Sequence, residues 1–140
     1  LPLAQLPSRK MLETDTMSAN RFTATRAQML LAQIDREGEL PASYPYPVGV
    51  WRLGTDLQFV TLGGEVVVDF AIRLKAELSE VRTWVAGYAN DVMAYIPSRR
   101  VLREGGYEGA SAMVYYGLPS SWSEDVEKRI VDEVQHQLAP

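Results

Sequence analysis

Two short apolar segments near the middle of the chain have the length and residue types of β-strands. Residues 48–53 and 57–62 are rich in valine, leucine and aromatic residues. The sequence Gly-Thr-Asp at 54–56 separates them and is typical of a hairpin turn. We therefore expect a pair of strands, the second of which runs into two glycines and a carboxylate at residues 63–65.

Apolar residues at helical spacing are found on both sides of this strand pair. Before it, a helix is expected from residue 23 or 25 to about residue 36, with Gly38 as its stop. After it, residues 66–78 contain three consecutive valines that favour a strand locally, but their length and period favour a helix. Glu65 then lies near the N-terminus of that helix, where the helix dipole favours an ionised carboxylate.

Both ends of the chain are patterned as well. Residues 1–7 alternate apolar and other residues between two prolines, as expected for an extended arm or edge strand, and Ser8 can cap a turn of helix. Residues 121–138 predict a terminal helix, with Ser121 and Glu124 spaced as a capping box. We expect this last helix to have a structural role.

Between residues 82 and 109 the pattern changes from strand to loop. Residues 82–89 predict a buried strand, and Asn90 and Asp91 end it. Residues 92–109 hold too many proline, glycine and charged residues for one long element, so they predict a functional loop with at most a short helix. Together the elements predict one α+β domain, with a small mixed or antiparallel sheet and three to four helices packed on it.

Composition narrows the classes of function. The chain has 140 residues and a net charge of −4, which favours a single domain and argues against a nucleic-acid-binding surface. It has no cysteine and one histidine, His136, so it cannot by itself build a thiolate site or a two-histidine zinc site. No apolar run approaches the length of a membrane-spanning helix. We expect a soluble chain, with the cytosol, the periplasm and secretion all left open.

Polar side chains follow the ends of two predicted strands. Glu65 comes after one strand, and Asn90, Asp91 and Tyr95 come after the next, so the four could line one edge of the sheet. The alternative is structural, with Glu65 capping a helix and Asn90-Asp91 making a turn. The pattern of residues alone leaves both open.

A resemblance favours the first alternative. The string LGGEVVVDFAIRLK, followed by VAGYANDVMAYIPSRRVLREGGYEGASAMVYYG, resembles the end of the catalytic domain in the neutral ceramidase family. The shared motifs are Gly64-Glu65 before a helix, Asn90 after a strand, Tyr95 five residues later, and the run YEGAS at 107–111. That family is a zinc amidase in which two histidines from an earlier region, with a glutamate and a tyrosine from this one, hold the metal.

The resemblance implies roles for particular residues. Glu65 and Tyr95 would be zinc ligands, because a carboxylate and a phenolate are oxygen donors that can complete a catalytic zinc site. The substrate would be an N-acylated amide or a lipid-like molecule. The residues expected to shape the pocket or contact this substrate are Asn90, Asp91, Arg99, Arg100 and Tyr107.

The histidines of the family are absent from these 140 residues. The chain begins at Leu1 with no leader sequence before it, so we expect a C-terminal fragment whose partner is the upstream catalytic portion of the same protein. The fragment alone should hold no catalytic residues and be inert. Its sheet should expose an edge or face that favours homo-oligomers of the isolated fragment.

There are two further departures from the family. Val92 stands where the family often has a second tyrosine, so the tyrosine ligand is assigned to Tyr95 alone. The residues after Tyr95 are Ile-Pro-Ser, at 96–98, where many members have two threonines. We therefore expect contacts different from those that bind ceramide. The other class of function left open is a stand-alone, non-catalytic binding or interaction domain in which Glu65 only caps a helix.

Overall fold

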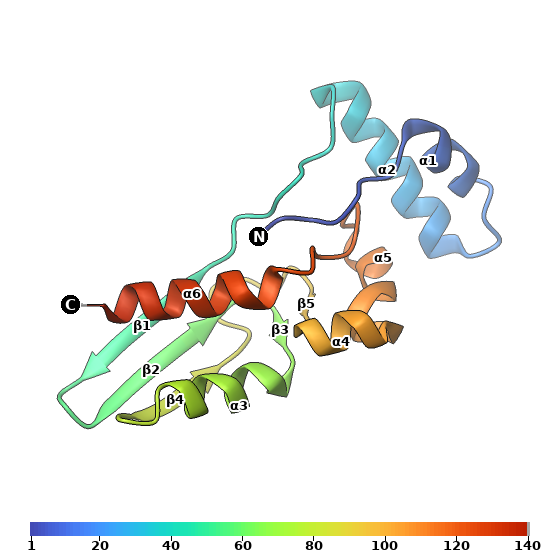
Figure 1. Ribbon diagram of the computed structural model, residues 1–140. Coiled ribbons are helices and arrows are strands. Elements are labelled where there is room, and N and C mark those ends of the chain that lie inside the picture. Colours follow the sequence, from blue (N-terminus) through green and yellow to red (C-terminus); the bar gives the residue numbers. More distant parts are fainter. Residues whose placement is uncertain (140) are drawn as a thin grey trace.

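The structure, a computed structural model, describes residues 1–139 and has the α+β class that the sequence predicts (Figure 1). Helices and two small sheets alternate along the chain. The elements are α1 (Arg9–Asp15), α2 (Arg21–Glu37), β1 (Val48–Leu53), β2 (Leu57–Leu62), β3 (Glu65–Val66), α3 (Val68–Glu77), β4 (Arg82–Ala86), β5 (Tyr95–Ile96), α4 (Arg99–Glu104), the π-helix η1 (Tyr107–Ser111), α5 (Met113–Tyr116) and α6 (Val126–Leu138).

The larger sheet has three strands in the order β1-β2-β4. The predicted hairpin is confirmed: β1 and β2 pair antiparallel, and Gly54 adopts a positive φ of 68° in the turn between them. β4 pairs with β2 in the parallel direction, so the connection through α3 crosses over the sheet. The sheet is therefore mixed, which was one of the two predicted forms.

Helices α3 and α6 cover one face of this sheet (Figure 1). The main hydrophobic core lies between these two helices and the sheet. Every second residue of β2 points into it, and Val60 and Leu62 have no exposed surface. The helices contribute the buried residues Phe70, Leu74, Val126, Ile130, Val131 and Val134. The β2 residues that alternate with Val60 and Leu62 project from the opposite face of the sheet. They do not belong to this core.

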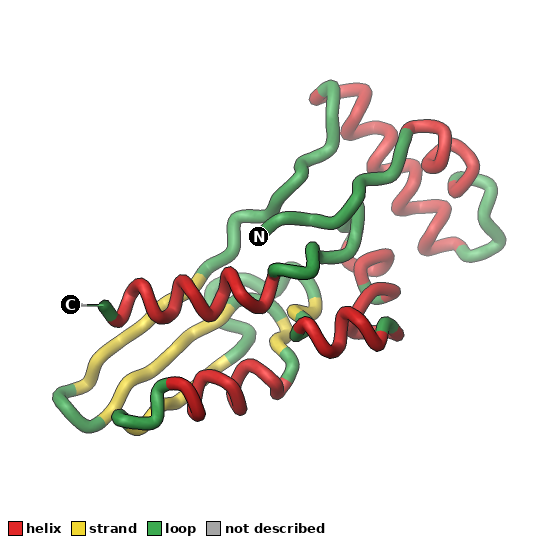
Figure 2. Tube along the Cα trace, in the orientation of Figure 1, coloured by secondary structure: helices red, strands yellow, loops and turns green. Residues whose placement is uncertain are grey.

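The N-terminal arm is extended, as predicted, and runs beside the connection between α2 and β1 (Figure 2). The Leu3 amide donates to Ala42 at 2.9 Å, and the Tyr44 amide donates to Leu1 at 2.8 Å. Ser8 caps α1 by accepting a hydrogen bond from the Met11 amide. The packing of α1 on α2 forms a second, smaller apolar cluster that joins this arm to the rest of the fold.

Several predicted boundaries are wrong. α2 begins at Arg21, before the expected residue 23 or 25, because the Asn20 side chain caps it. The terminal helix begins at Val126 with Asp125 as N-cap, and Ser121 and Glu124 form no capping box. The residues before it are extended because Trp122, 2 % exposed, is anchored in the core and donates from its indole to the Tyr95 carbonyl at 2.8 Å. The fourth strand ends at Ala86 instead of residue 89, because the backbone turns there.

Residues 92–109 were predicted to be a loop with at most a short helix. The short helix is present as α4, but β5 and the start of η1 were not predicted. Ser98 explains much of this order: it is 1 % exposed and accepts a hydrogen bond from the Val101 amide, which starts α4. Within residues 1–139, no helix is long and apolar enough to cross a membrane.

Candidate functional site

Glu65 and Tyr95 lie directly opposite each other in the small sheet. They are register partners across the parallel pair β3 and β5. The Glu65 amide donates to the Ala94 carbonyl at 2.9 Å, and the Val67 amide donates to Ile96 at 3.1 Å. Paired residues of neighbouring strands project from the same face of a sheet. Interaction with the Glu65 carboxylate raises the pKa of the Tyr95 phenol, as expected for two side chains on one face of the small sheet.

Gly64 brings a third segment to this point. It has a φ of 69°, its amide donates to Asp91 at 2.7 Å, and its carbonyl accepts from the Tyr88 amide at 2.8 Å. A Cβ at this position would lie 2.7 Å from the Ala94 carbonyl oxygen, closer than real side chains approach. Glycine is therefore required at position 64, because residues 93–96 pack directly against its backbone.

Tyr88 is a site residue that the sequence analysis missed. It is a non-glycine residue with a φ of 55°, a conformation that is uncommon for an aromatic side chain. Interaction with the Glu65 carboxylate raises the pKa of the Tyr88 phenol to about 12. The Tyr88 and Tyr95 phenols therefore both lie in the neighbourhood of Glu65. No spacing rule predicts this contact, because it depends on the backbone turn after β4.

Asn90 and Asp91 lie in the same turn but make different contacts. Asn90 is exposed and has a φ of 67°, a conformation that asparagine adopts more readily than most residues. The Asp91 carboxylate accepts a hydrogen bond from the Tyr44 hydroxyl at 2.7 Å and raises the pKa of that phenol. Asp91 therefore ties the connection between α2 and β1 to the turn after β4. Contact of either residue with a substrate stays a prediction.

The two predicted arginines are engaged by carboxylates. Arg100 forms ion pairs with Asp69 at 3.0 Å and with Glu104 at 2.8 Å. The Arg99 guanidinium lies 3.8 Å from the Glu124 carboxylate. The backbone amide of Arg99 donates to the Glu127 carboxylate at 2.7 Å. These contacts fix α4 against α3 and α6. A role of Arg99 and Arg100 in substrate binding stays a prediction.

The contact between Asp69 and Arg100 makes stability depend on pH. Hydrogen bonds from Arg100 and then Ser98 lower the pKa of Asp69 in the folded state. This stabilisation is present above the ordinary pKa of an aspartate, about 4, and is lost as the pH falls through the lower folded value. We expect Asp69→Asn to lose up to ~1 kcal/mol at neutral pH and to show a flatter stability curve in acid, measured by urea unfolding. An unchanged acid dependence would contradict the assignment.

Aromatic rings continue from Tyr95 toward α2. Tyr107, one of the predicted substrate residues, lies 5.5 Å from Tyr95 between ring centroids, and Tyr116 lies 6.3 Å from it. Tyr115 joins Tyr107 at 5.9 Å and Phe22 at 4.8 Å. We call these five rings the aromatic cluster. It connects the Glu65 carboxylate with the N-terminal end of α2.

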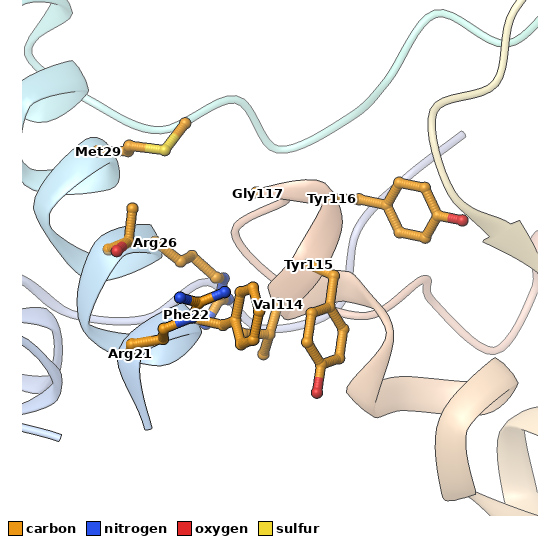
Figure 3. Close-up of a pocket in the computed structure, with 9 residues that line it drawn as sticks. Arg21, Phe22, Arg26, Met29, Val114, Tyr115, Tyr116 and Gly117 are labelled. Atoms are coloured by element: carbon orange, nitrogen blue, oxygen red, sulfur yellow. The ribbon is translucent and has the colours of Figure 1, made fainter. Parts of the chain in front are cut away.

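A hollow of about 350 Å³ lies between α2 and α5 at the far end of this cluster (Figure 3). Its wall includes Phe22, Tyr115 and Tyr116, and Figure 3 shows the Tyr116 ring pointing away from Phe22. Arg26 also lines it, donating to the Leu118 carbonyl at 2.7 Å and to the Pro119 carbonyl. Tyr116 therefore belongs both to the hollow and to the surroundings of Tyr95.

The donor set around Glu65 fits part of a zinc site. A carboxylate and a phenol are oxygen ligands of the kind that zinc accepts, and catalytic zinc usually has three protein ligands. Among residues 1–139, no group of three or more histidine, cysteine or acidic side chains could hold a metal ion. His136 is exposed on α6, beside Glu133. These residues could therefore hold zinc only together with ligands from elsewhere.

Comparison of the chain with models of protein families, with curated proteins and with solved structures gives no match.

Proposed function

We propose that this chain is the C-terminal part of a zinc-dependent amidohydrolase that resembles neutral ceramidase and cleaves an N-acyl amide bond. The observation that carries the proposal is the register pairing of Glu65 with Tyr95, which brings the two expected ligands onto one face. A shift of the strand pairing by one residue in either direction would turn these two side chains to opposite faces of the sheet. The YEGAS segment at 107–111 supplies Tyr107 to the same cluster.

In this proposal the chain provides two of the ligands and a wall of the substrate pocket. Zinc, when bound, would polarise the amide carbonyl and activate a water molecule. Glu65 and Tyr95 would hold it together with histidines from the upstream portion. Tyr88, whose phenol interacts with Glu65, would orient that carboxylate, as outer partners of metal ligands commonly do. The aromatic cluster offers apolar surface for the organic part of an N-acyl amide.

The proposal is tested in a polypeptide extended upstream to include the histidines. Glu65→Ala should lower both bound zinc and amide hydrolysis, the latter by ~100-fold or more, because a ligand contributes more than its outer partners do. Zinc would be measured by elemental analysis after gel filtration, and hydrolysis with an N-acyl amide substrate. Glu108→Ala is the matched control, because Glu108 is an exposed glutamate beside Tyr107 and should leave both quantities unchanged. Unchanged zinc and activity in Glu65→Ala would refute the ligand assignment.

The second candidate is a non-catalytic interaction domain. It is favoured by the uncovered face of the three-stranded sheet, where Trp51 and Trp84 are 61 % and 62 % exposed. The experiment above separates the two candidates, because an interaction domain in which Glu65 is only structural would bind no zinc in the extended polypeptide.

A further inference from the structure

The hollow between α2 and α5 has the size and the lining of a small-molecule site. Its volume of about 350 Å³ lies near the lower end of the range of ligand pockets, roughly 300–1,000 Å³. Two helices face each other across it (Figure 3): α2 contributes Phe22 and Met29, and α5 contributes Val114 and Tyr115. Phe22, Met29 and Tyr115 are 41, 58 and 51 % exposed. The apolar side chains of both helices are therefore accessible to a ligand.

Arg26 brings a positive charge to this apolar lining. Its side chain is half-buried, and burial lowers the pKa of its guanidinium. The Nε group donates to the Leu118 carbonyl at 2.7 Å, and Nη2 donates to the Pro119 carbonyl. A guanidinium has more N–H donors than these, and its Nη1–Nη2 edge has no acceptor within residues 1–139. Two backbone carbonyls thus hold the guanidinium in place and leave one edge for a ligand.

The positive charge at the hollow is not balanced by neighbouring carboxylates. Within residues 1–139, neither Arg26 nor Arg21, which also lines the hollow, forms an ion pair. Arg21 instead lies over the Phe22 ring, with its guanidinium carbon 4.7 Å from the ring centroid. Asp15 acts on Arg26 only from beyond ion-pair distance. In a chain whose net charge is −4, two such cations beside an apolar hollow favour an anionic ligand.

We propose that this hollow binds a small carboxylate that carries an aromatic ring. The planar carboxylate accepts two hydrogen bonds from the Nη1–Nη2 edge of Arg26, a fork geometry that matches a pair of oxygens. The ring of the ligand lies among Phe22, Tyr115 and Met29, where it contacts aromatic edges and a polarizable thioether. The inference does not rest on the zinc proposal, because neither of the proposed zinc ligands lines the hollow.

A titration of the 140-residue chain with 3-phenylpropionate, followed by nitrogen-resolved NMR, tests the proposal. The backbone amide signals of Met29 and Gly117 should shift saturably, with a Kd in the millimolar range expected for a ligand of about a dozen atoms. 3-Phenylpropionamide has the same shape without the charge and should bind ~10-fold more weakly. A lack of saturable shifts up to ~50 mM would overturn the proposal. So would equal affinities for the acid and the amide.

Two substitutions of Met29 separate the charge of the hollow from its shape. Met29→Glu places a carboxylate in the same hollow as Arg26 and should weaken binding of 3-phenylpropionate by ~10-fold or more. Met29→Gln, a neutral side chain of the same size, should weaken it by less than ~3-fold. Met29 is 58 % exposed, so both variants should keep their far-ultraviolet circular dichroism. Equal affinities of the two variants would contradict the proposed site.

Arg26→Gln removes the proposed contact with the carboxylate and should lower the affinity for 3-phenylpropionate by ~10-fold or more. Arg82→Gln is the matched control, because Arg82 is exposed on β4 and does not line the hollow. An equal loss in Arg82→Gln would show that binding follows the net charge of the chain, and would overturn the assignment to the hollow. Full affinity in Arg26→Gln would overturn it as well. If Arg26→Gln does not fold, the two Met29 variants decide.

Discussion

Replacing Gly64 with alanine is expected to lower the free energy of unfolding by ~4 kcal/mol and to separate Glu65 from Tyr95. The φ of 69° is unfavourable for alanine, and strained conformations of this kind cost about 1–3 kcal/mol. The new methyl group would also meet the Ala94 carbonyl oxygen at 2.7 Å and Ile96 at 2.8 Å. Relief of the clash requires β3 and β5 to move apart, and overpacking of this kind costs about 1–3 kcal/mol more.

Gly54→Ala is a control that isolates the clash from the strain. Gly54 has almost the same φ, 68°, but a Cβ there would meet nothing within 4 Å. We expect it to show the strain alone, about 1–2 kcal/mol. Urea unfolding gives both stabilities, and the ultraviolet titration of the tyrosines reports the contact of Tyr88 and Tyr95 with Glu65. Equal losses in the two variants would show that packing around Gly64 does not constrain the site.

Phe70→Ala should lower the free energy of unfolding by about 3–5 kcal/mol. Phe70 is completely buried between the sheet and α6, so its removal leaves a cavity in the main core. Ile72→Ala, on the same helix α3, is the control because Ile72 is 63 % exposed and should lose less than ~1 kcal/mol. Urea unfolding of both variants tests this ranking. Similar losses would mean that α3 does not pack on the sheet as the structure describes.

The elements that the sequence predicts well are those in which local pattern and packing agree. Strands 48–53 and 57–62 are confirmed to the residue, because the alternating burial of the second strand and the Gly54 turn specify the same hairpin. A helix after Glu65 is also confirmed, since the buried Phe70 and Leu74 fit a helical period, but it begins at Val68 instead of residue 66, because Val66 pairs in β3 and Val67 is extended. The capping box at Ser121 was wrong because burial of Trp122, a tertiary contact, sets where that helix begins.

Some contacts of the candidate site could be predicted from the sequence, and others could not. The meeting of Glu65 with Tyr95 follows from their pairing in β3 and β5, as the resemblance led us to expect. Tyr88 could not be predicted, because its phenol reaches Glu65 only through a positive φ that tyrosine rarely adopts. The carboxylate partners of Arg100 come from Asp69, 31 positions away, and from its own helix at Glu104. Periodicity does not encode contacts over such a distance.

The π-helix at Tyr107–Ser111 determines which side chains of the following helix, α5, face Tyr95 and Phe22. Each residue of an α-helix advances the chain by about 100°, and a π-turn holds one residue more than an α-turn. With this extra residue, Tyr116 is the side chain that α5 turns toward Tyr95, and Tyr115 is the one that meets Phe22. Deleting one residue from η1 would rotate α5 by about 100° and present a different side chain to Tyr95. The choice of Tyr116 for this place therefore depends on the length of the segment as well as on its residues.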